Sequence, residues 1–290
     1  MLDREEYVEQ QYFFRIYRER LQQNVPSQEF LQTIQEELLA TTRLPMAIDF
    51  LRTEILHSGR VSDAMTRLSH YFTPFQAFVM SRAEDDVSRF EQLIALQILE
   101  HEAEYRTKNP VKAGMFIFQF ECVARNRLGY NDGLLAISRD PIYDEPWKTW
   151  IMNLRRDLGA RELSEMVYAA SAYYTRLQQG AFRSDNGATE RVHLFGDQEG
   201  RIAKANIGRD PFYFFAALQR QLGYPAVPRS SSADETEKLP GFLESRLNKI
   251  EQRLKLLEME QRGGIDLTNF YRDSKPGEPP KFNDEIPDLS

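Results

Sequence analysis

Two short motifs pair a glutamate with a histidine at the spacing used by helical metal sites. Glu54 and His57 stand three residues apart, and His101 and Glu104 form the reverse pair further along the chain. Side chains three residues apart lie on one face of a helix, and di-metal sites in helical bundles use this Glu-x-x-His pattern. Such a site needs further carboxylates from two more helices. We therefore keep these four residues as a metal-binding alternative and predict no metal or cofactor.

The other reactive residue types point away from catalysis. Cys122 is the single cysteine and lies in the most apolar stretch of the chain, where a thiol is ordinarily inert. The sequence contains no Gly-x-Ser-x-Gly motif and none of the glycine-rich motifs that bind phosphate. We therefore predict no catalytic residue.

Two arginines are the candidate binding residues. Arg-Asp-Pro-apolar-Tyr occurs at 139–143 and again at 209–213, and Leu-Gly-Tyr also occurs twice. We interpret each Asp-Pro as the entry to a helix, with aspartate as N-cap and proline in the first turn. Glycine after leucine marks a helix end, because it adopts positive φ without strain. Only the arginines of the repeat, Arg139 and Arg209, have no structural role in this interpretation.

The elements that must position these residues are predicted to be helices. Apolar side chains recur at helical spacing in ten segments, which begin near residues 5, 27, 45, 62, 74, 86, 110, 146, 161 and 211. Residues 115–123 also fit a strand, but Asn109 and Gly129 frame a helix of sensible length. Two β-prone stretches around a glycine-bounded loop predict a hairpin at about 191–205. The fold class is therefore all-α with one small β-hairpin insertion.

Composition changes after residue 225 and divides the chain. We predict a helical globular domain at 1–225, a disordered linker at 226–238, a short coiled-coil helix at 239–262 and a largely disordered tail at 263–290. The coiled coil is indicated by leucine and isoleucine spaced 4, 3, 4 and 3 apart, at Leu243, Leu247, Ile250, Leu254 and Leu257.

Charges beside this apolar seam favour a parallel partner. Arg246 would face Glu251 of a second helix and Arg253 would face Glu258, and both contacts are attractive. The alternatives are a helix that folds back onto the main domain, or one that stays free. In the tail, "IDLTNFYRD" places Phe270 and Tyr271 in an apolar island that is either a binding motif or packs on its own domain.

Charge and hydropathy limit the kinds of partner that the protein can have. The formal net charge is -7, and neither the part before residue 226 nor the part after it is basic, which argues against wrapping nucleic acid. No apolar run approaches the roughly 18 residues that span a membrane, and the acidic start "MLDREEYVEQ" is unlike a signal peptide. We expect a cytoplasmic protein that binds protein partners or itself through 239–262.

Three stretches carry a resemblance to a known kind of protein. "SHYFTPFQAFV", "VARNRLGY" and "AALQRQLGYP" are similar to a family of uncharacterised bacterial helical proteins, over most of residues 1–229. The resemblance implies a helical fold and no particular site.

Together these patterns favour a non-catalytic interaction or scaffold protein that oligomerises through its C-terminal helix. The alternative is a helical metal- or small-ligand-binding protein, or an enzyme, that uses Glu54, His57, His101 and Glu104.

Overall fold

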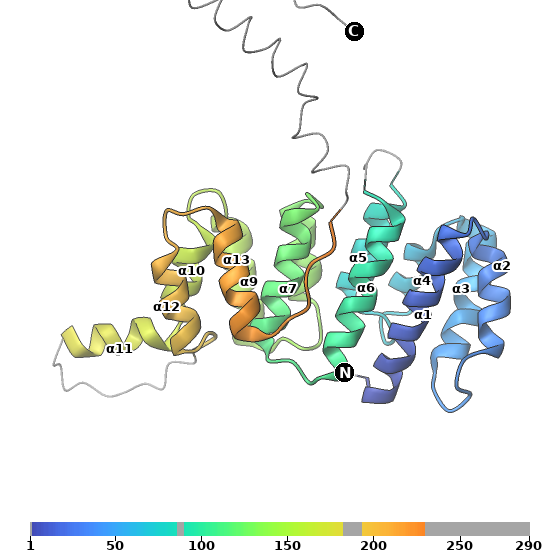
Figure 1. The fold of residues 1–290 in the computed structure, drawn as a ribbon, viewed down its shortest axis with the longest axis horizontal. Coiled ribbons are helices and arrows are strands. Elements are labelled where there is room, and N and C mark those ends of the chain that lie inside the picture. Colours follow the sequence, from blue (N-terminus) through green and yellow to red (C-terminus); the bar gives the residue numbers. More distant parts are fainter. Residues whose placement is uncertain (1, 86–89, 182–192, 230–290) are drawn as a thin grey trace, which may run out of the picture. The chain divides into compact units, whose positions relative to one another are not determined.

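The computed structural model describes residues 2–85, 90–181 and 193–229, and these form helices joined by short connections (Figure 1). The α-helices of this part are α1 (Arg4–Gln22), α2 (Ser27–Thr33), α3 (Leu44–Ser58), α4 (Val61–Arg67), α5 (Pro74–Ala83), α6 (Gln92–Thr107), α7 (Lys112–Arg125), α8 (Tyr130–Ser138), α9 (Glu145–Asp157), α10 (Leu163–Ala169), α11 (Ala172–Ala181), α12 (Asp197–Ala205) and α13 (Pro211–Leu222). A short 3-10 helix, Ile34–Glu36, follows α2. No strand occurs in the described residues, so the all-α prediction is confirmed there.

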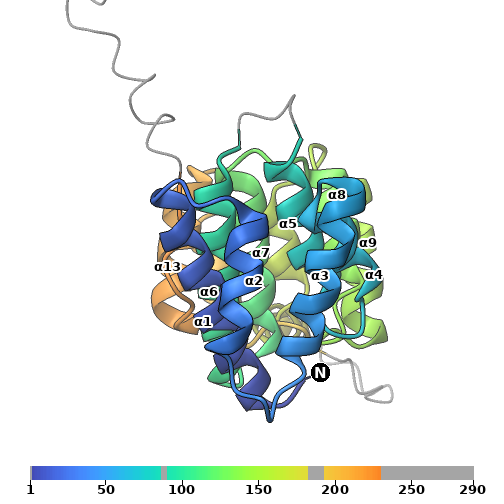
Figure 2. The ribbon, with the colours of Figure 1, turned by 90° about the vertical axis from the view of Figure 1, so that its right-hand side faces the viewer.

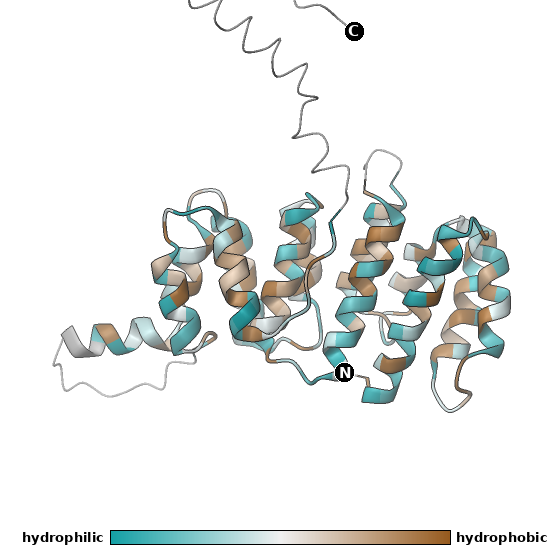
Figure 3. Cartoon of the chain, in the orientation of Figure 1, coloured by the Kyte–Doolittle hydropathy of each residue, from teal (hydrophilic) through white to brown (hydrophobic). Residues whose placement is uncertain are grey.

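Many of the helices pack against their neighbours in chain order, and several also contact helices further away in the sequence. α1 lies along α6, and α5 contacts both α6 and α8, so α5 links the first six helices to the later ones (Figures 1 and 2). Further along, α13 returns to pack on α7. One continuous apolar core runs through all of these contacts. Figure 3 shows hydrophobic and hydrophilic residues mixed around the helices rather than any helix that is hydrophobic throughout. Within the described residues, none of the helices has the length and apolar character needed to cross a membrane.

Local sequence signals explain several helix ends. The Thr73 hydroxyl accepts from the Gln76 backbone while the Gln76 side chain accepts from the Thr73 backbone, which forms a capping box at the start of α5. The Asp210 carboxylate accepts from the Phe212 backbone N–H at the start of α13. Gly223 ends that helix at φ 67°. The predicted boundaries of α13 are therefore confirmed.

Other helix starts are set by distant residues. At the start of α4, the two oxygens of Glu84 accept the Val61 and Ser62 backbone N–H groups, at 2.7 and 3.0 Å. At the start of α2, Ser27 makes no cap hydrogen bond, and its hydroxyl accepts from Tyr17 at 2.8 Å. The serine nearest to each helix start in the sequence is therefore not the capping group.

The hairpin predicted for 191–205 is wrong in the part that the structure describes. Residues 197–205 form α12, and the only extended contact is an isolated bridge between Ser171 and Phe195. That bridge interrupts the single helix predicted for 161–179 and separates α10 from α11. α12 passes close to the residues between α10 and α11. A Cβ added at Gly200 would stand 2.6 Å from Cβ of Ser171 and 2.7 Å from Cβ of Tyr173. Glycine at position 200 is thus required by packing.

The region around 115–138 resolves one ambiguity and adds a helix. Residues 115–123 are helical and buried in α7, which confirms the helix interpretation. Gly129, at φ 93°, is the residue before α8 and does not end α7, so the helix end predicted at this glycine is wrong. α7 ends at Arg125, and the residue with positive φ after it is Arg127, at 53°. α8 was not predicted, because its nine residues lie between Gly129, interpreted as the end of the preceding helix, and Asp140-Pro141, interpreted as the start of the next one.

Candidate functional site

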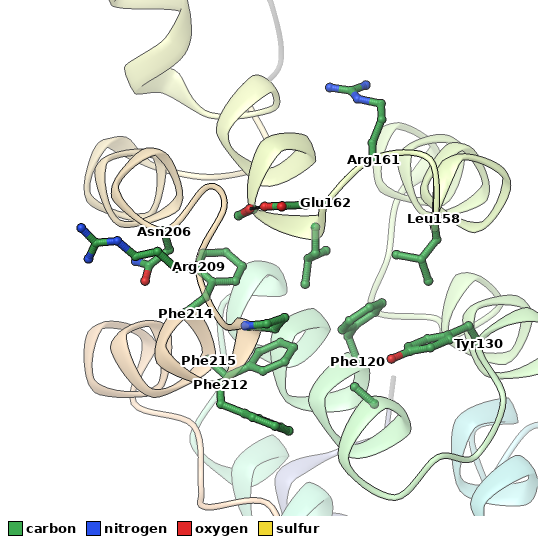
Figure 4. Close-up of a pocket in the computed structure, with 14 residues that line it drawn as sticks. Phe120, Tyr130, Leu158, Arg161, Glu162, Asn206, Arg209, Phe212, Phe214 and Phe215 are labelled. Carbon is green, nitrogen blue, oxygen red and sulfur yellow. Dashed lines mark hydrogen bonds between the residues drawn. The ribbon is translucent and has the colours of Figure 1, made fainter. Parts of the chain in front are cut away.

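One pocket in the described residues has five aromatic residues in its lining, and we call it the aromatic pocket. It has a volume of about 340 Å³ and lies between α7, the α9–α10 connection and the α12–α13 connection (Figure 4). Its rings are those of Phe120, Tyr130, Phe212, Phe214 and Phe215. Open apolar pockets of a few hundred Å³ are typical binding sites for small molecules or for single side chains of partners.

The floor of the pocket is a contiguous aromatic cluster. The Phe120 ring stacks on Tyr130 at a centroid distance of 5.7 Å and lies 6.1 Å from the Phe215 ring. Phe120, Phe214 and Phe215 are almost fully buried, whereas Tyr130 and Phe212 remain 46% and 51% exposed. The buried rings therefore form a rigid base, and the two exposed rings form a mouth that a ligand can cover.

Hydrogen bonds hold the two connections in place around this floor. One oxygen of Glu162 accepts the Gly208 backbone N–H at 2.9 Å and the Ser164 hydroxyl at 3.0 Å. This carboxylate joins the start of α10 to the α12–α13 connection, although the two are 46 residues apart. The mouth of the pocket is consequently fixed by a bond that local sequence does not reveal.

A second set of contacts attaches α13 to α7 beside the pocket. The Tyr224 hydroxyl lies 2.6 Å from Glu121 Oε2 and 3.0 Å from the Phe215 carbonyl oxygen. Glu121 also forms an ion pair with Arg125, whose guanidinium sits 4.7 Å from the centroid of the Phe212 ring. Tyr224 thus packs back onto the helix that it follows, and these contacts together position Phe212.

Arginines stand at the rim. Arg161 and Arg209 line the pocket, and Figure 4 shows their guanidinium groups directed outward from it. Arg161 lies 3.9 Å from Glu165, while no ion pair is found for Arg209 within the described residues. With Glu162 already engaged, the rim favours an anionic group beside an apolar one.

The structure separates the two candidate binding arginines. Arg209 is at the aromatic pocket, but Arg139 is exposed at the end of α8 and is not among the lining residues. A single site that uses both arginines is therefore not formed.

The aspartates of the two repeats also differ in role. Asp210 caps α13 as predicted. Asp140 was expected to cap a helix too, but α9 begins at Glu145 and is capped by Asp144. Asp140 is instead fully buried, where it accepts the Ile142 backbone N–H at 3.1 Å and pairs with Arg106 of α6.

Asp140 belongs to a buried polar network that the sequence analysis missed. Arg106 donates to Glu102 at 2.9 Å and to Asp140, and all three side chains are inaccessible to solvent. Gln119 of α7 donates to Glu102 at 2.8 Å and to Asp140 at 2.9 Å, and its oxygen accepts from Tyr143 at 2.8 Å. The network joins α6, α7 and the α8–α9 connection.

The charge state of this network follows from its burial. Desolvation raises the pKa of the Glu102 carboxyl above its ordinary value, Asp140 adds to that rise, and Arg106 opposes it without cancelling it. Desolvation lowers the pKa of Arg106, but Asp140 and Glu102 outweigh it and keep this guanidinium charged. At pH values below the raised pKa of Glu102, where this carboxyl keeps its proton, the network holds one buried cation, Arg106, facing one buried anion, Asp140. The network is thus a structural element rather than a solvent-accessible site.

The four metal-binding candidates are not brought together. Glu54 pairs with Arg67 at 2.6 Å, and Glu104 pairs with Lys108 at 2.7 Å. Nδ1 of His101 lies 2.9 Å from the Ala226 carbonyl oxygen, and His57 is exposed near the end of α3. In the part of the chain that the structure describes, no three His, Cys, Asp or Glu side chains are grouped to hold a metal ion.

Cys122 is buried in α7, and desolvation raises the pKa of its thiol well above the usual value. The residues predicted to interact through the C-terminal helix and tail, including Leu247, Phe270 and Tyr271, lie outside the described residues.

Comparison of the chain with protein-family models, with curated proteins and with solved structures finds no match in any of the three. The resemblance to uncharacterised bacterial helical proteins therefore stays a prediction, and function must be argued from the site itself.

Proposed function

We propose that this chain is a non-catalytic interaction protein whose aromatic pocket receives an aromatic side chain, flanked by acidic residues, from a partner. The observation that carries the proposal is the buried floor of Phe120, Phe214 and Phe215 beneath two half-exposed rings, with Arg161 and Arg209 at the rim.

The energetics of such a pocket suit protein recognition. Phe212 and Tyr130 still expose about half of their surfaces, so covering them removes apolar area from water. Aromatic side chains that fill well-packed pockets supply most of the affinity of many interfaces. The rim arginines would add selectivity for acidic partners and speed association more than they add affinity.

The lining offers little for catalysis. It contains neither histidine nor cysteine, and its one serine, Ser164, donates to a carboxylate that also holds the Gly208 backbone. Because the Glu162 carboxylate has this structural role, its hydrogen bond with Ser164 resembles a contact at the start of a helix more than the activation of a nucleophile.

Self-association through 239–262 and a cytoplasmic location remain part of the proposal, and both rest on sequence. Light scattering of the full chain tests the first. Leu247→Asp together with Leu254→Asp is expected to lower the measured mass, whereas Arg139→Asp is not. An unchanged mass in the leucine variant would remove the coiled coil from the proposal.

The pocket proposal is tested with fluorescein-labelled peptides and the full chain. One peptide has the pattern acidic-acidic-Leu-Phe-Tyr-acidic, and its partner has lysine at the acidic positions. We expect only the acidic peptide to bind measurably. Phe212→Ala should weaken it by about tenfold or more, which corresponds to at least about 1.4 kcal/mol.

A neighbouring residue supplies the matched control for Phe212→Ala. Tyr213 is 70% exposed and does not line the pocket, so Tyr213→Ala should leave affinity within about twofold. Equal loss in both variants, or no preference between the two peptides, would refute the pocket as the recognition site.

The volume of the pocket also favours a second candidate, a small apolar ligand that carries an acidic group. The chain would then be a small-ligand-binding protein, as in the alternative from the sequence, but its site would be the aromatic pocket rather than Glu54, His57, His101 and Glu104. Saturable binding of a medium-chain fatty acid that Phe212→Ala abolishes, with no binding of either peptide, would decide for it.

A further inference from the structure

A cluster of tyrosine rings and cationic side chains lies where α10, α11 and α12 meet, and none of its members lines the aromatic pocket. The guanidinium carbons of Arg176 and Arg201 stand 5.6 and 5.4 Å from the centroid of the Tyr173 ring. Nζ of Lys204 stands 5.9 Å from the same centroid and 5.8 Å from that of the Tyr168 ring. We call these five residues the cationic cluster.

Packing of three helices builds this surface. Asp197, Arg201 and Lys204 lie four and three residues apart, which places them on one face of α12. α12 packs on both α10 and α11, which bring Tyr168 and Tyr173 close to its cations. The tyrosine rings then hold these cations by cation–π attraction. No run of basic residues marks the cationic cluster in the sequence, because its members come from three separate elements.

The cationic cluster has an excess of positive charge. Asp197 forms ion pairs with both Arg176 and Arg201, and its pair with Arg201 is 3.0 Å long. No ion pair is found for Lys204 in the described residues, so one carboxylate faces three cations. The side chains of Arg176 and Arg201 are 58% and 53% exposed and keep guanidinium N–H donors for a further acceptor. This surface therefore differs in sign from the chain as a whole, whose formal net charge is -7.

Carboxylates of a protein partner fit the cationic cluster better than a nucleic acid does. The planar guanidinium donors of arginine match a carboxylate, and cations already held against rings lose less freedom on binding. Bases would need an open ring face for stacking, whereas the Tyr173 ring is already in contact with three cations. A long polyanion would also be repelled by the acidic remainder of the chain.

One short stretch of chain joins the cationic cluster to the aromatic pocket. Lys204 lies near the end of α12, two residues before Asn206 and five before Arg209, which both line the pocket. Five residues span at most about 18 Å. Figure 1 shows α12 beside α13, whose first residues also line the pocket. A partner segment that leaves the pocket past the end of α12 therefore needs only a few residues to reach Lys204.

We propose that the cationic cluster binds an acidic segment of the same partner whose aromatic side chain enters the aromatic pocket. This inference rests on the proposed function, because the pocket supplies the anchor. It adds that the acidic residues of the partner continue beyond those that meet the rim arginines. Arg201 and Lys204 thereby determine specificity for a longer acidic segment.

Peptides of different length test the proposal with the full chain. The six-residue acidic peptide described above is compared with two ten-residue versions, which carry four more glutamates at the N-terminal or the C-terminal end. We expect one extended peptide to bind at least about fivefold more tightly than the six-residue peptide. Arg201→Glu together with Lys204→Glu should remove this gain and leave the affinity for the six-residue peptide within about twofold.

Arg60→Glu together with Arg139→Glu is the matched control, because it makes the same change in net charge at exposed positions that belong to neither site. This control should keep the gain from the extra glutamates. Both double variants should also keep the circular dichroism spectrum of the wild-type chain, since all four positions are exposed. An equal loss in both variants, or equal affinity of all three peptides for the wild-type chain, would overturn the proposal.

Two further probes separate this proposal from the proposed function and from nucleic-acid binding. Fluorescein-labelled decaglutamate has no aromatic side chain, so its binding should be lost in the Arg201→Glu, Lys204→Glu variant and unchanged by Phe212→Ala. If Phe212→Ala leaves the extended peptides unaffected as well, the proposed function fails while the cationic cluster stands as a surface for acidic segments. Decaglutamate binding that the cluster variant leaves unchanged, or tighter binding of a ten-nucleotide oligo(dT), would overturn the proposal.

Discussion

Arg106 of α6 forms an ion pair with Asp140, 34 residues later in the chain, and neither side chain is exposed to solvent. The pair bridges α6, which packs on α1, and the connection between α8 and α9. Gln119 of α7 reaches the same carboxylate, so three parts of the body meet at one charged group. We expect the network to favour this arrangement, because a packing that separated Arg106 from Asp140 while both stayed buried would leave an unpaired charge.

Arg106→Met should therefore destabilise the protein severely. It keeps most of the side-chain volume but leaves Asp140 buried without its cation, and breaking a buried pair in this way costs about 3–5 kcal/mol. Urea unfolding followed by circular dichroism measures the loss. Arg139→Met, at an exposed position, is the control and should change the free energy of unfolding by less than about 0.5 kcal/mol. A loss below about 1 kcal/mol for Arg106→Met would mean that the network does not specify the packing.

Much of the fold was predictable because helix punctuation is local. Thr73-Pro74 and Asp210-Pro211 mark helix starts through bonds that span three residues or fewer, and Gly59 and Gly223 end helices through positive φ. Where a distant group replaces the local cap, as Glu84 does for α4, sequence proximity gives the wrong answer.

The two copies of the Arg-Asp-Pro motif show that the same local sequence can have different structural roles. The same substitution of the aspartate in each copy tests this difference. Asp210→Asn keeps a good N-cap at α13, so the free energy of unfolding should change by less than about 0.5 kcal/mol. Asp140→Asn has the same chemistry, but it removes the charge that faces buried Arg106 and should cost at least about 3 kcal/mol. Urea midpoints of the two variants are compared directly. Similar losses would show that the two aspartates are equivalent after all.

The candidate site was less predictable than the fold. Arg209 was identified as a residue that helix punctuation could not explain, and it lines the aromatic pocket. The pocket itself combines α7, α13 and two connections, and the bond from Glu162 to Gly208 that holds it spans 46 residues. The sequence did contain one indication of the pocket. Phe212, Phe214 and Phe215 are too close together to lie on one buried face of α13, so at least one of these rings must face elsewhere.

Cys122 should be unreactive in the folded protein. Its side chain is fully buried in α7, and desolvation raises the pKa of the thiol well above its usual value, which leaves almost no thiolate at neutral pH. With Ellman's reagent at pH 8, we expect no labelling of the native chain within minutes and one thiol per chain in 6 M guanidinium chloride. Rapid labelling without denaturant would show that α7 opens readily.

Glu102 makes stability depend on pH in an unusual direction. Burial raises the pKa of this carboxyl in the folded protein, so the folded state keeps the proton at pH values where the unfolded chain, with a pKa of about 4.3, has lost it. A raised pKa contributes stability that is complete below the unfolded value and is lost as pH rises through the folded value. Glu102→Gln carries no such proton. The free energy of unfolding of the variant should therefore increase relative to wild type as pH rises above about 4.3, with a slope of at most about 1.4 kcal/mol per pH unit.

Urea titrations of both proteins between pH 4.5 and 8 measure this difference, which cancels the contributions of all other carboxylates. Glu104 lies on the same helix, is partly exposed and pairs with Lys108, so Glu104→Gln controls for replacing a glutamate with an amide there. A difference that shrinks as pH rises would mean that Glu102 is ionised in the folded protein. In that case Arg106 would face two buried anions, and the network would carry a net negative charge.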